Sequence, residues 1–145
     1  MICTFIGHRN TPNTIEPILR NEIIRLIENG KIDKFYLGTH GNFDYLVLNI
    51  LRQLKKTYNI TYNVVLPYIP KADDRFSKYE NTILPAGFET TPPKFAIINR
   101  NHWMIENCDF LICYVTQDIT NAYDFMKLAR KKQKKIINLA DRTSI

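Results

Sequence analysis

The sequence predicts an α/β fold in which a mostly parallel, five-stranded sheet is covered by helices on both faces. Short, nearly continuous apolar runs alternate along the chain with longer segments whose apolar residues recur every three or four positions. The first pattern is typical of strands that are buried on both faces, and the second is typical of amphipathic helices. The alternation of the two predicts parallel strands joined by helical crossovers.

Composition indicates one domain over residues 1–145. A hydrophobic fraction of 45% and a charged fraction of 23% are ordinary for a globular protein, and the length suffices for one core. The net charge of +6 suits an anionic partner. Neither a secretory signal nor an apolar run of about 18 residues is seen, so we expect a cytoplasmic protein without a membrane partner. The absence of a C-x-x-C pair predicts that Cys3, Cys108 and Cys113 are free, buried thiols.

The chain opens with a strand that ends at the turn Gly7, His8 and Arg9. This turn places polar and cationic groups at the carboxyl end of a buried strand. A helix follows, with Thr14 as its expected N-cap and one apolar stripe over residues 15–27. Asn29 and Gly30 are expected to end this helix, with a residue in the left-handed backbone conformation at its C-terminus.

A second strand over residues 34–37 leads into the motif Gly38-Thr39-His40-Gly41-Asn42-Phe43-Asp44 and then an amphipathic helix over residues 46–54. Such a turn is a natural anion seat, because glycines let backbone N–H groups approach an oxyanion and the helix dipole favours negative charge. Asp44 suits a ribose hydroxyl. The alternative is that the glycines only permit a tight turn, Asn42 caps the helix, and Asp44 is a favourable charge in the first helical turn.

A third strand over residues 60–66 precedes a long segment, 68–92, which is rich in proline and aromatic residues. Irregular segments of this length are uncommon in compact domains unless they cover a binding site, and the aromatic content argues against disorder. We therefore expect a flap that closes over the ligand or packs on a neighbouring subunit. This segment includes Arg75, Phe76, Tyr79, Glu80 and Glu89.

The rest of the chain repeats the strand–turn–helix plan. A helix over residues 94–107 contains Arg100 and Asn101, and a strand covers 109–115. A polar turn over 116–121 then leads into a helix over 122–132 and a last strand over 136–139. Basic residues cluster near the end of the last helix, where the dipole favours them; we expect a solvated surface there, with nucleic-acid contact as the less favoured alternative.

Right-handed crossovers make a Rossmann-like three-layer α/β/α sandwich the natural topology. The turns at Gly7, Gly38 and Thr116 should then lie at one edge of the sheet, where ligands bind in open α/β folds. His8 and His40 could meet there, but no group of histidines or cysteines has metal-ligand spacing, so we expect neither a metal nor a cofactor.

Several of these motifs occur in an order that resembles the SLOG superfamily, in particular its small bacterial YspA/YpsA-like branch, over nearly the whole chain. They are Gly7-His8-Arg9, Gly38-x-x-Gly41-x-x-Asp44, Arg100-Asn101 and the strand that begins at Asp109. The resemblance implies a Rossmann-like fold, a nucleotide or nucleotide-derived ligand, and a homo-oligomer. It also implies a set of ligand-binding residues: Gly7, His8, Arg9, Gly38, Thr39, Gly41, Asn42, Asp44, Arg100, Asn101, Thr116, Thr120 and Asn121.

One departure from the family pattern bears on catalysis. The Gly-Gly pair that many relatives carry is replaced by Thr120-Asn121, and the glutamate of LOG phosphoribohydrolases falls near Lys127. Thr120 and Asn121 can still donate hydrogen bonds and cap a helix. The missing carboxylate, however, is the group that would stabilise an oxocarbenium-like centre.

Three hypotheses for the function follow. The first is a sensing or regulatory module that binds a nucleotide without cleaving it. The second is an N-glycosidase, phosphoribohydrolase or nucleoside deoxyribosyltransferase-like enzyme, with Asp44, Glu80, Glu89 or Asp124 as its carboxylate. The third and least favoured is DNA binding in the manner of DprA, which the net charge suggests. The catalytic residues, if any, stay unknown.

Overall fold

Six parallel strands form the central sheet of the computed structural model, which describes residues 1–69 and 81–143. Within these ranges the strand order is β4-β3-β2-β1-β5-β6, and every neighbouring pair is parallel. The strands are β1 (Ile2–Gly7), β2 (Lys34–Leu37), β3 (Thr61–Val65), β4 (Thr82–Ile83), β5 (Phe110–Tyr114) and β6 (Lys135–Asn138). The predicted α/β fold with a mostly parallel sheet is therefore confirmed.

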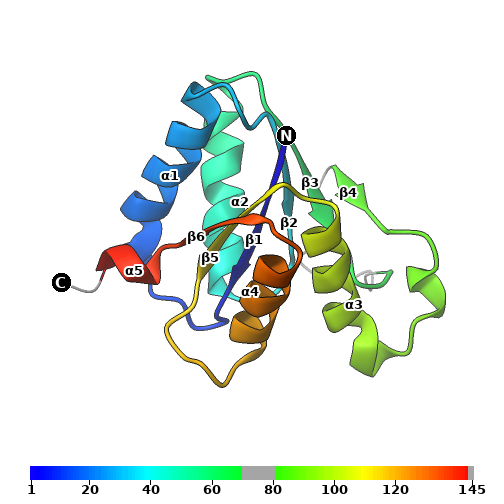
Figure 1. The fold of residues 1–145 in the computed structure, drawn as a ribbon. Helices are drawn as coiled ribbons and strands as arrows, with labels where there is room; N and C mark the ends of the chain where they lie inside the picture. Colours follow the sequence, from blue (N-terminus) through cyan, green and yellow to red (C-terminus); the bar gives the residue numbers. More distant parts are fainter. Residues whose placement is uncertain (70–80, 144–145) are drawn as a thin grey trace.

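Helices cover both faces of this sheet (Figure 1). Alternate strand residues point to opposite faces and enter two separate cores. Phe5 and Phe35 pack in the core beneath α1 (Glu16–Glu28) and α2 (Asn42–Leu54). Ile6 and Cys113 pack in the core beneath α3 (Pro93–Glu106) and α4 (Asn121–Lys131). The short helix α5 (Ala140–Thr143) is held to α1 by an ion pair between Arg142 and Glu22. The result is a three-layer α/β/α sandwich.

The prediction of five strands is wrong by one, because β4 lies in the segment that was expected to be irregular. The Val64 amide donates to the Asn81 carbonyl (2.9 Å), and the Leu66 amide donates to the Ile83 carbonyl (2.8 Å). A strand of two residues is too short to show an alternating pattern, so only its pairing with β3 reveals it. The part of the expected flap at 70–80, which includes Arg75, Phe76, Tyr79 and Glu80, lies outside the described residues.

The first helix does not begin as predicted. Thr14 lies within a short 3-10 helix, Asn13–Ile15 (η1), and Ile15 occupies the N-cap position of α1 without a side-chain cap. Ile15 already has helical backbone angles (φ −82°, ψ −5°). A 3-10 turn that continues directly into the α-helix leaves no extended residue whose side chain could fold back as a cap.

The three cysteines behave as predicted: all are free and buried. Burial raises the pKa of Cys108 and of Cys113 to about 12. Thiols in this state are unreactive at neutral pH. Among the helices that the structure describes, none combines the length and apolar character needed to cross a bilayer.

The close approach of α2 to the end of β1 depends on Gly7. A Cβ atom built at Gly7 would overlap Cγ of Phe43. Phe43 is 1% exposed and belongs to the core between α2 and the sheet. The missing side chain at Gly7 therefore lets the first turn of α2 press against the carboxyl end of β1, where the candidate site lies.

We expect Gly7→Ala to lower the free energy of unfolding by about 3 kcal/mol, because the new methyl group overlaps a fully packed ring. Gly30→Ala is the matched control. Gly30 has φ +71°, and no atom lies within 4 Å of the position that a methyl group would take there, so only the backbone conformation is penalised, at about 1 kcal/mol. Urea denaturation of both variants measures the two costs. An equal or smaller loss at Gly7 would contradict the steric account.

Candidate functional site

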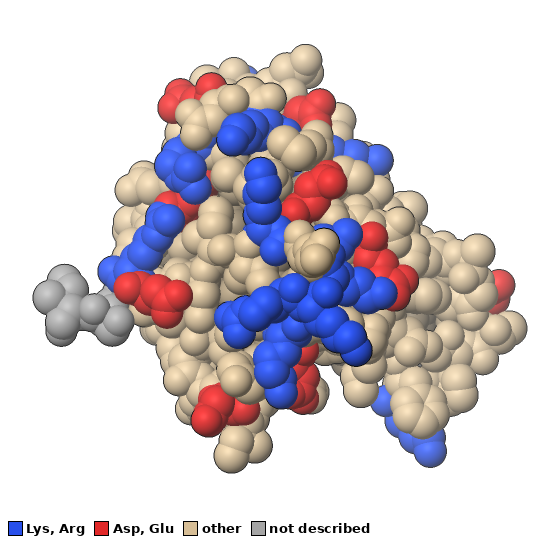
Figure 2. Space-filling view, viewed as in Figure 1, with Lys and Arg blue, Asp and Glu red and all other residues tan. Residues whose placement is uncertain are grey.

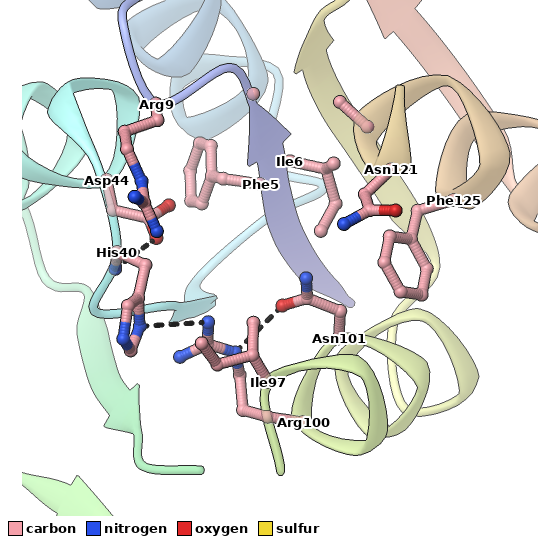
Figure 3. Close-up of a pocket in the computed structure, with 12 residues that line it drawn as sticks. Phe5, Ile6, Arg9, His40, Asp44, Ile97, Arg100, Asn101, Asn121 and Phe125 are labelled. Atoms are coloured by element: carbon pink, nitrogen blue, oxygen red, sulfur yellow. Dashed lines mark hydrogen bonds between the residues drawn. The ribbon is translucent and has the colours of Figure 1, made fainter. Parts of the chain in front are cut away.

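A cavity of about 150 Å³ opens at the carboxyl end of the sheet. The chain progresses from β1 to β2, β3 and β4 on one side of β1, then crosses to β5 on the other. Crevices at such a reversal are the usual ligand sites of open α/β sheets. Figure 3 shows the lining side chains converging from β1, α2, α3, α4 and the turns after β1 and β2. They are Phe5, Ile6, Gly7, Arg9, His40, Asp44, Ile97, Arg100, Asn101, Asn121, Ala122 and Phe125.

The turns after β1 and β2 are locked together, and this positions Arg9. The Asn42 amide donates to the Arg9 carbonyl (2.8 Å), and the Asn42 side chain donates to the Thr11 carbonyl (2.6 Å). Gly41 has φ +91°, and a Cβ atom there would lie 2.6 Å from Cα of Arg9. Only glycine fits this approach. The Arg9 backbone is thus held in place, while its exposed side chain lines the cavity.

Arg100 is buried and engaged by the protein itself, being 1% exposed. Its Nε donates to Asn101 Oδ1 (2.8 Å). Its Nη1 donates to Thr39 Oγ1 (3.0 Å) and to the Val65 carbonyl (3.2 Å). Burial lowers the pKa of Arg100, and the negative charge of Asp44 opposes that shift. Arg100 therefore fastens α3 to the turn after β2 and to the end of β3, with one edge of its guanidinium forming part of the cavity wall.

Asp44 is the carboxylate among the cavity's lining residues, and it is 9% exposed. Burial raises its pKa to about 6, although the charge of Arg100 and a hydrogen bond from the His40 amide (3.0 Å) act in the opposite direction. A carboxyl with this pKa exchanges its proton close to neutral pH. Asp44 is therefore able to accept or donate a proton at the cavity wall.

Two backbone amides of the predicted anion seat donate hydrogen bonds to the protein itself. The His40 amide donates to the Asp44 carboxylate, and the Asn42 amide donates to Arg9. Asp44 thus occupies the place that the sequence pattern suggested for a ligand oxyanion. The cationic side chains that line the cavity are those of Arg9 and Arg100, and of the two only Arg9 is exposed.

The third predicted turn, at residues 116–121, holds the elements next to the cavity in place. The Thr116 amide donates to Nε2 of His8 (3.0 Å), and burial lowers the pKa of His8, so the imidazole is a neutral acceptor. Thr120 caps α4 by accepting from the Tyr123 amide (3.2 Å). This cap places Asn121, the first residue of α4, at the cavity.

The structure divides the thirteen predicted site residues into two groups. Six line the cavity: Gly7, Arg9, Asp44, Arg100, Asn101 and Asn121. The others lie behind it or brace its loops: His8, Gly38, Thr39, Gly41, Asn42, Thr116 and Thr120. Gly38 is buried directly against the Asp44 carboxylate and the Arg100 guanidinium.

Sequence reasoning missed the other lining residues. Helical spacing was a usable signal for two of them, because Ile97 lies four residues before Asn101 and Phe125 lies four after Asn121. His40 lay within the Gly38–Gly41 turn but was not assigned to the site. Its ring is also in edge-on contact with Tyr68 (centroids 6.4 Å apart), where the expected flap begins.

A metal site is not formed by the part of the chain that the structure describes, since no three His, Cys, Asp or Glu residues gather there. The carboxylates named for the enzymatic hypothesis are also dispersed. Glu89 lies in the 3-10 helix Phe88–Thr90 (η3), Asp124 faces solvent on α4 beside Lys127 (3.5 Å), and Glu80 is outside the described residues. Of the carboxylates named for the enzymatic hypothesis, Asp44 is thus the one that lines the cavity among the residues that the structure describes.

The raised pKa of Asp44 predicts a pH-dependent stability with a definite sign. The folded protein retains a proton that the unfolded chain, with a pKa of 3.8, releases between about pH 4 and pH 6. The contribution of Asp44 to the free energy of unfolding therefore falls as pH rises through this window, by up to about 3 kcal/mol. Asp44→Asn removes this titration, so the stability of the variant relative to the parent should increase from pH 4 to pH 6 and then level off.

Urea denaturation at a series of pH values tests this expectation, with Glu89→Gln, at an exposed carboxyl outside the cavity, as the control. A difference between Asp44→Asn and the parent that stays constant, or that shrinks as pH rises, would show that burial does not control the Asp44 carboxyl.

Comparison with known proteins adds no identification. Neither a scan against protein-family models nor a search of curated proteins finds a match to this chain. The functional conclusion therefore depends on the chemistry of the cavity and on the resemblance described above.

Proposed function

We propose that the protein binds a nucleotide or a nucleotide-derived molecule through its phosphate at the carboxyl edge of the sheet, in a sensing or regulatory role. The observation that carries the proposal is that Arg9, Arg100 and Asn121, from three separate segments, line one cavity. The resemblance of the motif order to the SLOG superfamily supports the same class of ligand.

Charge and hydrogen-bonding capacity favour a phosphate in this cavity. Arg9 is exposed and its planar guanidinium suits bidentate contact with phosphate oxygens. Asn101 and Asn121 add amide groups, and the amino-terminal end of α4 carries a partial positive charge. These groups lie beside Phe5, Ile6 and Ile97, which exclude water and strengthen the attraction.

Cavity size indicates which end of the ligand is enclosed. At about 150 Å³, the cavity is smaller than the roughly 300–1,000 Å³ of pockets that enclose whole drug-sized molecules. It fits a phosphate and part of a ribose. We therefore expect the base to extend beyond the cavity and to contribute less to affinity than the phosphate.

A second candidate, N-glycosidic cleavage of a nucleotide, is favoured by Asp44 alone. Its carboxyl lines the cavity and has a pKa of about 6, which suits a general acid or base near neutral pH. The resemblance puts the glutamate of LOG enzymes near Lys127, and Lys127 lines a different cavity on the outer side of α4. Binding without cleavage remains the better supported proposal.

Arg9→Ala is the sharpest test of binding, because Arg9 is exposed whereas truncating Arg100 would also remove contacts that hold the fold. Loss of a charge-assisted hydrogen bond, worth roughly 1.5–3 kcal/mol, should weaken binding by about 10- to 100-fold. Isothermal titration with AMP, GMP, ADP and ADP-ribose measures the effect, and adenosine tests the need for phosphate.

Arg52→Ala is the matched control, since Arg52 lies in the last turn of α2, at the opposite end of that helix from the cavity. It should bind as the parent does. The proposal fails if Arg9→Ala and the parent bind every nucleotide equally well, or if no member of the panel binds the parent.

Chromatographic detection of free base separates the second candidate from the first. Incubation of the parent with nucleoside monophosphates should release no base if the protein only binds. Release by the parent that Asp44→Asn abolishes would establish cleavage and assign it to the Asp44 carboxyl. Release that persists in Asp44→Asn would exclude that carboxyl from the reaction.

A further inference from the structure

A second hollow region lies between α3 and α4, on the outer side of the molecule. It consists of two adjoining cavities of about 490 Å³ and 390 Å³. Both are lined by His102, Leu128 and Lys131, so they form one continuous groove along the two helices. This region, the α3–α4 groove, is separate from the nucleotide cavity, with which it shares only Asn121 and Phe125 among the lining residues.

The floor of the α3–α4 groove is apolar. Ile98 from α3 and Phe125 and Leu128 from α4 line it, and Ile98 is 40% exposed. Phe95, 47% exposed, lies three residues before Ile98 and continues the apolar strip along α3. The His102 and Phe125 rings pack edge to face against each other, with centroids 5.4 Å apart. An apolar surface of this kind, left open between two helices, is typical of a binding surface.

Basic side chains outnumber acidic ones at the rim of the groove. The rim is lined by three lysines, Lys127, Lys131 and Lys132, and by two carboxylates, Asp124 and Glu106. The lysines belong to a run in which six of the nine residues at 127–135 are Lys or Arg. Figure 2 shows this basic cluster gathered over α4. Lys127 pairs with Asp124 (3.5 Å) and Lys132 pairs with Glu106 (3.5 Å), but both pairs are exposed and therefore weak. Within residues 1–69 and 81–143, Lys131 pairs with no carboxylate.

Three kinds of occupant can be compared on this chemistry. A second copy of the chain on a two-fold axis would bring the same lysines face to face, which is repulsive. A nucleic acid would satisfy the lysines, but it lacks aliphatic groups to pack against Ile98 and Leu128 on the floor. An amphipathic helix with carboxylates beside its apolar stripe satisfies both the floor and the rim.

We propose that the α3–α4 groove is a docking site for an acidic amphipathic segment of a partner protein. Its apolar side chains would pack on Ile98 and Leu128, and its carboxylates would pair with Lys127 and Lys131. The proposal does not depend on the nucleotide cavity. The two sites are adjacent, since Phe125 lines both.

Selection from a displayed library of short helical peptides tests the proposal without assuming a partner. The full chain is the target, and a Lys127→Glu/Lys131→Glu double variant is used for counter-selection. Enriched peptides should combine carboxylates with apolar residues at helical spacing. Fluorescence anisotropy of an enriched peptide should show binding that weakens about tenfold or more in the double variant and in Ile98→Asp.

Two matched controls separate the groove from general charge or general exposure. Lys55→Glu/Lys56→Glu changes the net charge by the same amount at the end of α2, and Ile119→Asp replaces an isoleucine that is 92% exposed outside the groove. Both should bind the peptide as the parent does, and circular dichroism should show every variant folded.

Several outcomes would overturn the proposal. They are the enrichment of no peptide, enriched peptides that lack carboxylates, and affinity that is unchanged in Ile98→Asp. A labelled oligothymidylate that binds the parent in competition with the peptide, but is indifferent to Ile98→Asp, would assign the surface to nucleic acid. A homodimer that Ile98→Asp dissociates in sedimentation would assign it to a second copy.

Discussion

Burial of the Arg100 guanidinium is the constraint on which the candidate site depends. A buried charge is tolerated only when its hydrogen bonds are made and an opposite charge is near. Asn101, Thr39 and the Val65 carbonyl accept from it, and Asp44 supplies the opposite charge. Satisfying these requirements brings α3, the turn after β2 and the end of β3 together. The contacts that stabilise the buried charge of Arg100 thus also form the wall of the cavity.

Because Arg100 is buried, the two arginines at the cavity have different roles. Arg100 is engaged by the protein and shapes the cavity, whereas Arg9 is exposed and available to a ligand. Asp44 completes the arrangement, because its carboxylate accepts the hydrogen bond from the His40 amide that a ligand oxyanion could otherwise accept. Binding in this cavity therefore depends on side chains carried by a braced scaffold. The stability of the fold should therefore tolerate mutation at exposed lining residues such as Arg9 better than at the packed contacts behind them.

Strong periodic patterns made most of the fold predictable, and long-range contacts account for what was missed. The stripes of α1 and α2 and the apolar run of β5 predicted their elements, whereas β4 is defined by its pairing with β3 rather than by its own two residues. Strand ends and turns also predicted the edge of the sheet at which the cavity lies. They did not predict that Arg100 would be buried, or that Phe125 would close the cavity, because both depend on how α3 and α4 pack.

A nuclear magnetic resonance titration can test whether one cavity at the carboxyl edge of the sheet receives a phosphate-bearing ligand. The isotopically labelled protein is titrated with AMP and with ADP-ribose. Shifts in backbone amide resonances should centre on Arg9, His40, Asn101 and Asn121, with little change at the far ends of α1 and α2. Shifts centred on the outer faces of the helices, or none at saturating nucleotide, would contradict this expectation.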